Sequence, residues 1–231
     1  MIADANIAAA AALMADPTRA AFLTRLLDGR AYTATDLARR ARVSPSTASS
    51  HLAKLVAGGL AVMERSGRYH YFRLANPTVA HALEAIASVA PAAPVQGLKE
   101  AQTGTAIRFA RTCYDHLAGR LGVAVTEGLV QAGALTALGT GFEVTPFGVE
   151  RLATIGVDAE ALRRSRRKFA PRCLDWSERR HHVAGALGAA LAGAMLERGW
   201  LRRSEASRAV YVTEAGRAGL AQFVALPIIG L

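Results

Sequence analysis

Cysteine is scarce in this chain of 231 residues, which has two, Cys113 and Cys173. Two cysteines do not make the framework of a small disulfide-stabilised secreted domain. Long apolar runs are also missing: the run over residues 183–196 is about 14 residues, shorter than the ~20 that a transmembrane helix needs. The N-terminal stretch lacks a basic start and carries Asp4, so it does not resemble a secretion signal. These absences predict a cytoplasmic protein that does not enter a membrane.

Acidic residues are in the minority, since 18 Asp and Glu stand against 28 Lys and Arg and leave a net charge of +10. A basic surface suits a polyanionic partner, because side chains that neutralise phosphates release condensed counterions. Charge alone does not distinguish nucleic-acid binding from other roles. The length and the 52% hydrophobic content are sufficient for two domains.

The first 90 residues alternate between helix signals and turn signals. Asp16-Pro17 and Ser44-Pro45 each join a capping residue to a proline, a preferred start of a helix. Gly67 divides two runs rich in β-branched and aromatic residues, which predicts a hairpin. The predicted helices cover 3–15, 18–27, 35–41, 45–57 and 77–89, and the predicted strands cover 60–65 and 69–74. This order predicts a mainly α fold with small β-hairpins (α+β), in which residues 1–90 form a winged helix-turn-helix domain for DNA binding and dimerisation.

The predicted helix 45–57 has two unlike faces. Ala48, Leu52, Leu55 and Val56 share an apolar face, and the opposite face offers short hydroxyls and cations. Such side chains can bind base edges and phosphates when a helix enters the major groove, and a basic hairpin tip can reach the neighbouring minor groove or backbone. An ordinary solvated surface is the alternative. The predicted DNA-binding residues are Ser46, Thr47, Ser49, Ser50, His51, Lys54, Arg68 and Tyr69.

Several stretches of this region resemble one known family in order and spacing. They are residues 13–19 (LMADPTR), 35–38 (TDLA), 43–55 (VSPSTASSHLAKL), 57–60 (AGGL) and 67–74 (GRYHYFRL). On these motifs, residues 13–83 resemble the arsenic-repressor (ArsR/SmtB) family of bacterial winged-helix transcriptional regulators. The resemblance implies a homodimer joined through the first and fifth helices. It also implies a repressor that binds an inverted-repeat operator in double-stranded DNA until an inducer releases it. Apolar residues that fit such a dimer seam lie in 3–15 and at Val79, Leu83, Ile86 and Val89.

The metal sites of the metal-sensing members are missing from the corresponding positions. The third predicted helix, residues 35–41, has no thiol. The positions that align with the fifth-helix zinc site are Asn76, Thr78, Val89 and Ala92, which do not form a set of zinc ligands. The resemblance therefore does not imply arsenic sensing.

The second half is unusually long for that family. Residues 91–98 are rich in Pro and Gly and predict a linker, followed by a C-terminal domain over 99–231. Helical patterns cover 99–121 and 124–134. The chain then repeats itself weakly, because VTPFGVERL at 144–152 is similar to VTEAGRAGL at 212–220. We expect a helical domain, with a degenerate second winged-helix unit as one form of it and effector binding as its role.

Both cysteines lie in this half, each near basic residues, a carboxylate and a histidine. A basic neighbourhood favours the thiolate, the form that reacts and binds metals. In the predicted helix 99–121, the side chains of Cys113 and His116 would share a face. One hypothesis is a sensor that binds a metal ion or metalloid, or forms a disulfide, where these residues meet: Cys113, His116, Cys173, His181 and His182. The plainer alternative is two buried core cysteines.

Signs of catalysis are missing. The sequence has no phosphate-binding glycine loop, nucleophile elbow or zinc-protease helix, so we expect a protein that is not an enzyme. Three roles of the second half stay open: a thiol or soft-metal sensor, a small-molecule receptor, or no effector role. The last would make the protein an effector-independent repressor.

Overall fold

A computed structural model describes residues 4–91 and 97–224. The chain divides into two compact units, Met1–Leu83 and Glu84–Leu231, and the boundary falls within α5 (Pro77–Val89). Ala3 of the expected first helix and most of the expected linker lie outside the described residues. No helix in the described ranges combines the length and the apolar character that a membrane crossing requires.

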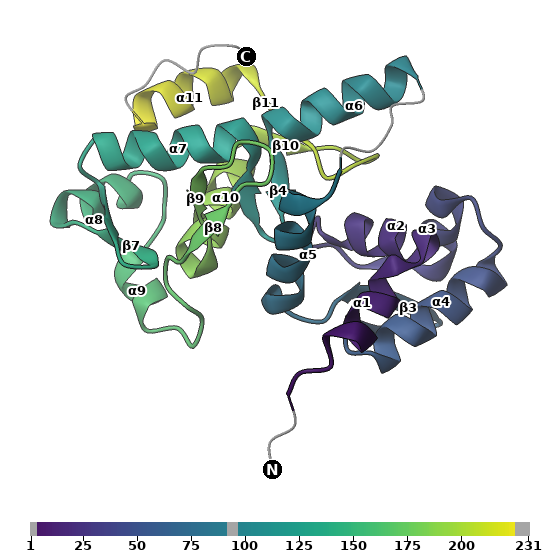
Figure 1. Ribbon diagram of the computed structural model, residues 1–231. Coiled ribbons are helices and arrows are strands. Elements are labelled where there is room, and N and C mark those ends of the chain that lie inside the picture. The colour runs from purple at the N-terminus through teal and green to yellow at the C-terminus, as the bar shows by residue number, and fades with distance from the viewer. Residues whose placement is uncertain (1–3, 92–96, 225–231) are drawn as a thin grey trace. The chain divides into compact units, whose positions relative to one another are not determined.

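The N-terminal unit has the element order of a winged helix-turn-helix (Figure 1). Its elements before α5 are α1 (Ile7–Ala15), α2 (Pro17–Leu26), β1 (Tyr32–Thr33), α3 (Ala34–Ala41), α4 (Pro45–Ala57), β2 (Ala61–Ser66) and β3 (Tyr69–Leu74). The three strands form an antiparallel sheet in the order β1-β3-β2. Every helix and the hairpin expected here from the sequence are present.

Side-chain caps fix the starts of these helices. The amide of Thr47 donates to Ser44 Oγ at 3.1 Å, and a capping box joins Thr33 to Asp36 at the start of α3. Each cap satisfies a backbone N–H that has no partner within its helix. The large buried side chains of the unit come from α2, α3, α4 and β3, and they are Phe22, Leu23, Leu26, Leu37, Leu52, Leu55 and Leu74.

The C-terminal unit contains the end of α5, then α6 (Leu98–Phe109), and then the same motif built twice: hairpin, helix, hairpin, helix. The first copy comprises β4 (Arg111–Cys113), β5 (His116–Ala118), α7 (Gly119–Gln131), β6 (Leu135–Leu138), β7 (Gly141–Val144) and α8 (Pro146–Ala153). After α9 (Ala159–Arg163), the second copy comprises β8 (Arg172–Leu174), β9 (His181–Val183), α10 (Gly185–Glu197), β10 (Leu201–Arg203), β11 (Val210–Val212) and α11 (Glu214–Val224). The weak repeat at 144–152 and 212–220 is one part of this duplication.

The two copies share the same close backbone contacts. A Cβ added at Gly122 would lie 2.5 Å from the carbonyl oxygen of Leu117, and one added at Gly188 would lie 2.5 Å from that of Val183. Only glycine permits a helix to approach the preceding hairpin this closely. The glycines therefore set the same helix-on-hairpin packing in each copy.

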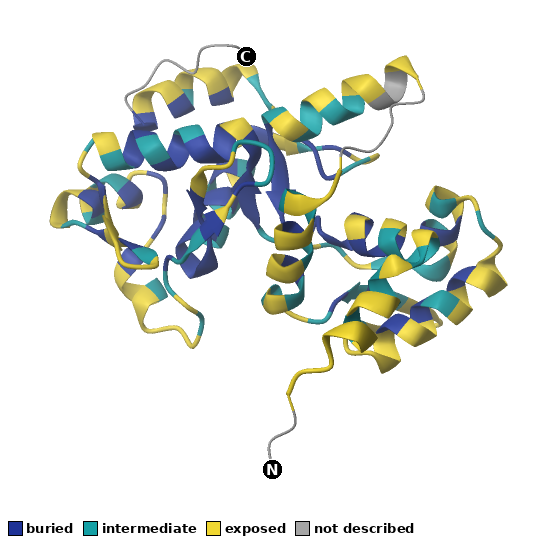
Figure 2. Cartoon of the chain, in the orientation of Figure 1, coloured by how far each residue is buried: buried dark blue, intermediate teal, exposed yellow. Residues whose placement is uncertain are grey.

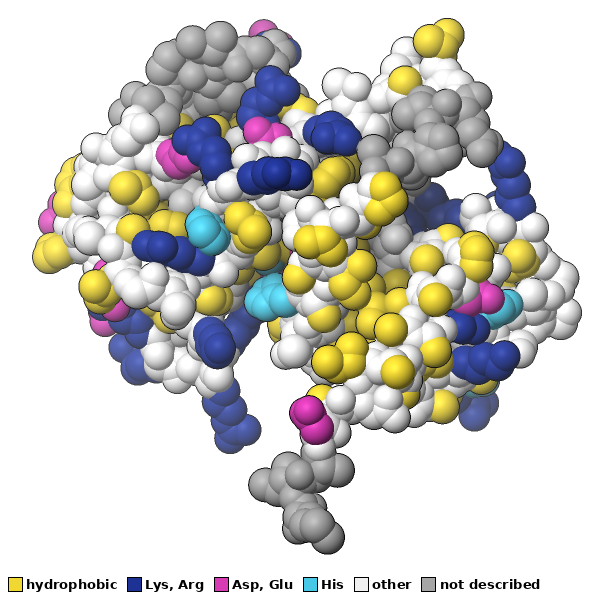
Figure 3. Space-filling model, viewed as in Figure 1, with side chains coloured by type: hydrophobic (Ala, Val, Ile, Leu, Met, Phe, Trp, Pro, Cys, Tyr) yellow, Lys and Arg dark blue, Asp and Glu magenta, His cyan; other side chains and the backbone are white. Residues whose placement is uncertain are grey.

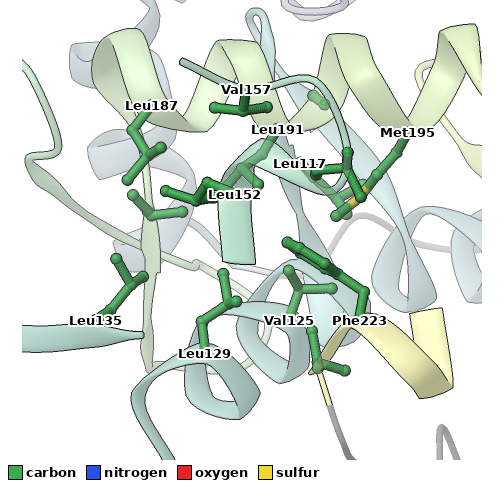
Figure 4. Close-up of a cluster of buried hydrophobic side chains, with 14 of the residues drawn as sticks. Leu117, Val125, Leu129, Leu135, Leu152, Val157, Leu187, Leu191, Met195 and Phe223 are labelled. Carbon is green, nitrogen blue, oxygen red and sulfur yellow. The ribbon is translucent and has the colours of Figure 1, made fainter. Parts of the chain in front are cut away.

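Both copies contribute to one apolar core (Figure 4). In Figure 2 the buried residues of α7 form a continuous stripe, whereas α6 shows mainly exposed and intermediate residues. The core residues labelled in Figure 4 are Leu117, Val125, Leu129, Leu135, Leu152, Val157, Leu187, Leu191, Met195 and Phe223. Packing of the two copies therefore holds the unit together.

The predicted helix over 99–121 is wrong beyond Phe109. The chain leaves the helix there and forms β4 and β5, which pair antiparallel with Cys113 opposite His116. Tyr114 takes a left-handed φ of 61° in the turn between the strands. The apolar spacing in this stretch fits a helix and a short hairpin alike, and the tertiary packing selects the hairpin. Cys113 and His116 are therefore cross-strand neighbours and do not share a helical face.

Candidate functional site

The outer face of α4 presents a row of small polar side chains. Its inner face is fixed by Ala48, Leu52 and Leu55, which are fully buried. The prediction was wrong for Val56, which lies at the edge of this face near the end of the helix and is exposed. The exposed outer residues are Ser46, Thr47, Ser49, Ser50 and Lys54. The structure thus turns the hydroxyl-rich face of the helix to solvent, as the sequence predicts.

Local hydrogen bonds order this face at the start of the helix. Ser44 Oγ lies 2.8 Å from both Ser46 Oγ and Thr47 Oγ1, and Ser49 Oγ donates to the Pro45 carbonyl at 2.9 Å. The hydroxyls are therefore held in place, and those of Ser46, Thr47 and Ser49 keep capacity for a further partner.

His51 is set apart from the other predicted contact residues. Its side chain is 18% exposed, and its Nδ1 lies 3.4 Å from Asp16 Oδ1 and 3.5 Å from Arg19 Nη1. These contacts tie α4 to the start of α2. His51 therefore anchors the helix on its inner flank, with only part of its ring open to solvent.

The wing is the β2–β3 hairpin, with Gly67 at its tip in a left-handed conformation (φ 58°). Arg68 Nη2 donates to Tyr69 Oη at 2.9 Å, and the guanidinium lies 5.0 Å from the centre of that ring. Both side chains are exposed. On the face drawn in Figure 3, other Lys and Arg side chains are scattered among exposed hydrophobic ones, in keeping with the net charge of +10.

A second candidate site lies inside the C-terminal unit. Cys113 and His116 of the first copy meet Cys173 and His182 of the second, and one ligand atom from each lies within 4.8 Å of the others. The two Sγ atoms are 4.0 Å apart, and the two imidazole centroids are 5.1 Å apart. All four side chains are buried, and both cysteines are free thiols. His181, which the sensor hypothesis also includes, is exposed and lies outside this cluster.

A carboxylate lies beside each histidine of the cluster. His116 Nδ1 is 3.4 Å from Asp115 Oδ1, and His182 Nδ1 is 3.5 Å from Asp175 Oδ2. Asp175 is fully buried and also accepts hydrogen bonds from Arg111 Nη2 at 2.9 Å and from the amide of Gly119 at 2.6 Å. The two halves of the cluster thus repeat one another in their surroundings as well as in their ligands.

The side chains of the cluster shift the pKa values of its two histidines in opposite directions. Although burial by itself lowers it, Cys113 and Asp115 raise the pKa of His116 to about 9. Burial and the charge of His116 hold the pKa of His182 well below its ordinary range. The Cys173 thiol and complete burial raise the pKa of Cys113 well above its ordinary range. His116 therefore takes up a proton more readily than His182.

The duplication around the cluster has a sequence signal that the weak repeat further along the chain did not reveal. Residues 116–122 read HLAGRLG and residues 182–188 read HVAGALG. Each begins with a cluster histidine and ends with the glycine that packs against the preceding hairpin. The cysteines are 60 residues apart and the histidines 66, so an alignment of the chain with itself pairs the cysteines only when it allows a gap in the hairpin before the histidine.

The chain has relatives among known proteins. Residues 14–64 match a family described as a helix-turn-helix domain. The chain is 45% identical over 212 residues to the HTH-type transcriptional regulator YdfF of Bacillus subtilis (strain 168), covering 92% of this chain and 94% of that protein. Among solved structures, it is similar to NolR from Sinorhizobium fredii (26% identity, 40% of this chain and 100% of that one, TM-score 0.35). It is also similar to the cadmium metal-sensor CMTR from Mycobacterium tuberculosis (34% identity, 39% and 94% covered, TM-score 0.32).

Proposed function

Because the chain belongs to the helix-turn-helix transcriptional regulators, we propose that it reads duplex DNA through the outer face of α4 and the β2–β3 wing. The observation that carries this proposal is the orientation of α4. Its leucines are buried, while Ser46, Ser50 and Lys54 face solvent. Hydroxyls and an ammonium at this spacing fit base edges and phosphates in a major groove.

The wing and the start of α4 supply the contacts that position the helix. Arg68 and Tyr69 would bind the adjacent backbone or minor groove, where a guanidinium is favoured. The N-terminus of α4 is the positive end of the helix dipole and favours a phosphate. His51 would act mainly by holding α4 against α2, since its Nδ1 faces Asp16.

We further propose that the protein binds an inverted-repeat operator as a homodimer. Exposed apolar side chains lie on α1 and α5, where Ile7 is 77% exposed, Ile86 46% and Val89 83%. A second copy would cover these residues and place two α4 helices on successive major-groove faces. As a repressor, such a dimer would occlude its operator until an effector weakens binding.

The C-terminal unit is the place where an effector would act, and the role proposed for it is regulatory and not catalytic. The cluster of Cys113, His116, Cys173 and His182 favours a sensor of a metal ion or oxidant, because free thiols 4.0 Å apart are held beside two buried imidazoles. A small-molecule receptor is the second candidate. It is favoured by a pocket of about 500 Å³ between α6 and β11, lined by apolar side chains that include Phe109 and Val212.

The test of DNA reading is the double variant Lys54→Ala/Arg68→Ala, assayed on DNA from upstream of its own gene. The matched control is Lys168→Ala/Arg202→Ala, which removes one exposed lysine and one exposed arginine from the C-terminal unit. Each lost phosphate contact makes the slope of log K against log salt shallower by about 0.9. The double variant removes two contacts from each protomer of a dimer, so its slope should be shallower by about 4. The control should keep the wild-type slope. Unchanged affinity and slope in the first variant would contradict the proposed surface.

A further inference from the structure

We infer that Cys113, His116, Cys173 and His182 bind one zinc ion, Zn²⁺, which joins the two copies of the internal repeat. This inference deepens the effector role proposed above by naming the ligand class and the coordination. Each copy supplies one cysteine and one histidine, paired in register across its first hairpin, Cys113 with His116 and Cys173 with His182. The ion would therefore lie between the β4–β5 and β8–β9 hairpins.

The spacing of the donor atoms fits a tetrahedral site. Zn–S bonds of about 2.3 Å and Zn–N bonds of about 2.0–2.1 Å place the donors of a tetrahedron roughly 3.3–3.8 Å apart. The Sγ atoms of Cys113 and Cys173 are 4.0 Å apart, and all four donors lie within 4.8 Å of one another. An inward movement of less than about 1 Å by each side chain would bring them to bonding distance of one ion.

The chemistry of the donors selects zinc. Two thiolates and two neutral imidazoles neutralise the charge of Zn²⁺, so a loaded site would add no net charge to a buried position. On binding, the two thiols and any protonated imidazole would release their protons to solvent, and each imidazole would bind through a lone pair. The set is complete with four protein ligands, which is the pattern of a closed site with no position left for a substrate.

The surroundings of the histidines match those of metal ligands. Asp115 and Asp175 lie beside the Nδ1 atoms of His116 and His182 at 3.4 and 3.5 Å, which leaves Nε2 of each ring for the ion. A carboxylate on the far nitrogen is a common way to fix the tautomer and orientation of a zinc-bound histidine. His182 is 1% exposed, and neither of its ring nitrogens has a hydrogen-bond partner among the described residues. A bound ion would satisfy one of them.

A disulfide between Cys113 and Cys173 is the competing use of the same side chains. It would need an oxidant and an approach of the sulfurs to about 2.05 Å. It gives no role to the two histidines that the repeat places in the cluster. Zinc binding uses all four residues and explains why cysteine and histidine recur as a pair.

The experiment begins with the full-length wild-type chain, purified under reducing conditions and analysed for metal. We expect one zinc per chain, and release of at least two protons per ion when Zn²⁺ is added back to chelated protein. Replacement by Co²⁺ should give the intense visible bands of a tetrahedral ion and a near-ultraviolet band from thiolate ligation. The inference would be overturned if the chelated protein took up neither Zn²⁺ nor Co²⁺. It would also be overturned if a thiol titration found Cys113 and Cys173 joined as a disulfide in the native protein.

Variants identify the ligands. His182→Gln and Cys173→Ser should each weaken Co²⁺ binding at least tenfold, and His181→Gln, a change in the exposed neighbour on the same strand, should leave it unchanged. Equal Co²⁺ binding by the His182 and His181 variants would refute the assignment. The wild-type spectrum serves as the test should a ligand variant fail to fold.

The metal and DNA readouts separate this inference from the proposed function. A wild-type chain that binds DNA and holds no zinc would refute the zinc site alone. A chain that holds zinc and shows no DNA affinity, with or without the ion, would refute the DNA-reading surface alone.

Discussion

Replacing Glu84 with glutamine should lower the unfolding temperature of the C-terminal unit markedly. Glu84 is 2% exposed and lies between two buried cations. Its Oε1 pairs with Arg208, and its Oε2 is 3.6 Å from Arg111 Nη2. Glutamine keeps the shape of the side chain and removes its charge. Both arginines would then stay buried with one carboxylate fewer to balance them.

The size of the effect follows from this burial. Removing one partner of a buried ion pair costs about 3–5 kcal/mol, because it leaves an uncompensated charge. In domains of about 150–250 residues, each 1 kcal/mol lowers the Tm by about 2–4 °C. The variant should therefore unfold about 6–20 °C below the wild type.

Tryptophan fluorescence can follow this unit alone, because both tryptophans of the chain, Trp176 and Trp200, belong to it. The matched control is Glu160→Gln, the same change in the same unit. Glu160 is 54% exposed and accepts a hydrogen bond from Arg163 at 3.1 Å. Exposed ion pairs contribute about 0–1 kcal/mol, so the control should stay within about 4 °C of the wild type.

Equal transition temperatures for the two glutamine variants would refute the reasoning. A further variant tests the cause of the effect. Replacing Glu84 and Arg208 together with methionine removes both charges, and a buried pair replaced by apolar side chains is often no less stable. This double variant should recover part of the loss, whereas a defect of shape at position 84 would persist.

Two other perturbations test the packing of each unit. Gly188→Ala should destabilise the C-terminal unit by more than about 2 kcal/mol, because the new Cβ would lie 2.5 Å from the Val183 carbonyl oxygen. In the control Gly193→Ala, in the same helix, the new Cβ meets no atom within 4 Å and should stabilise the unit by about 0.5–1 kcal/mol. Tryptophan fluorescence during chemical denaturation measures the stability of both variants, and equal effects would contradict the close contact at Gly188. In the N-terminal unit, burial and the hydrogen bond to Asp28 raise the pKa of Tyr32 to about 12. The folded state therefore holds this proton more tightly than the unfolded state, and up to about 2 kcal/mol of stability should be lost as the pH rises from about 10 to about 12. Tyr32→Phe should lack this loss when alkaline denaturation is followed by circular dichroism. If the stability of the variant falls with pH as steeply as that of the wild type, another group is responsible.

The sequence specified the N-terminal unit through local signals. Ser44-Pro45 starts α4 at the predicted residue, and the spacing of Ala48, Leu52 and Leu55 fixes which face is buried. A cap and its helix lie within a few residues of one another, so composition and periodicity are sufficient to place them. The same applies to the wing, where Gly67 supplies the left-handed turn.

Local signals misplaced the segment that follows α6. Apolar residues up to Leu117 fit a helical period, and yet the chain forms the β4–β5 hairpin. Its turn needs a left-handed Tyr114, and the helix after it begins at Gly119, where an added Cβ would lie 2.7 Å from the Arg108 carbonyl oxygen. Both features depend on the residues that pack against this segment, and helix propensity takes no account of such tertiary contacts.

The sequence by itself determined the winged helix-turn-helix, the exposed face of α4 and the presence of thiols and histidines in the second half. Only the tertiary structure decided that Cys113 and Cys173, 60 residues apart, lie with their sulfurs 4.0 Å from each other. The physical reason is that helix and strand signals act over a few residues. The meeting of the two cysteines depends instead on how two copies of a repeat bury their apolar faces against one another.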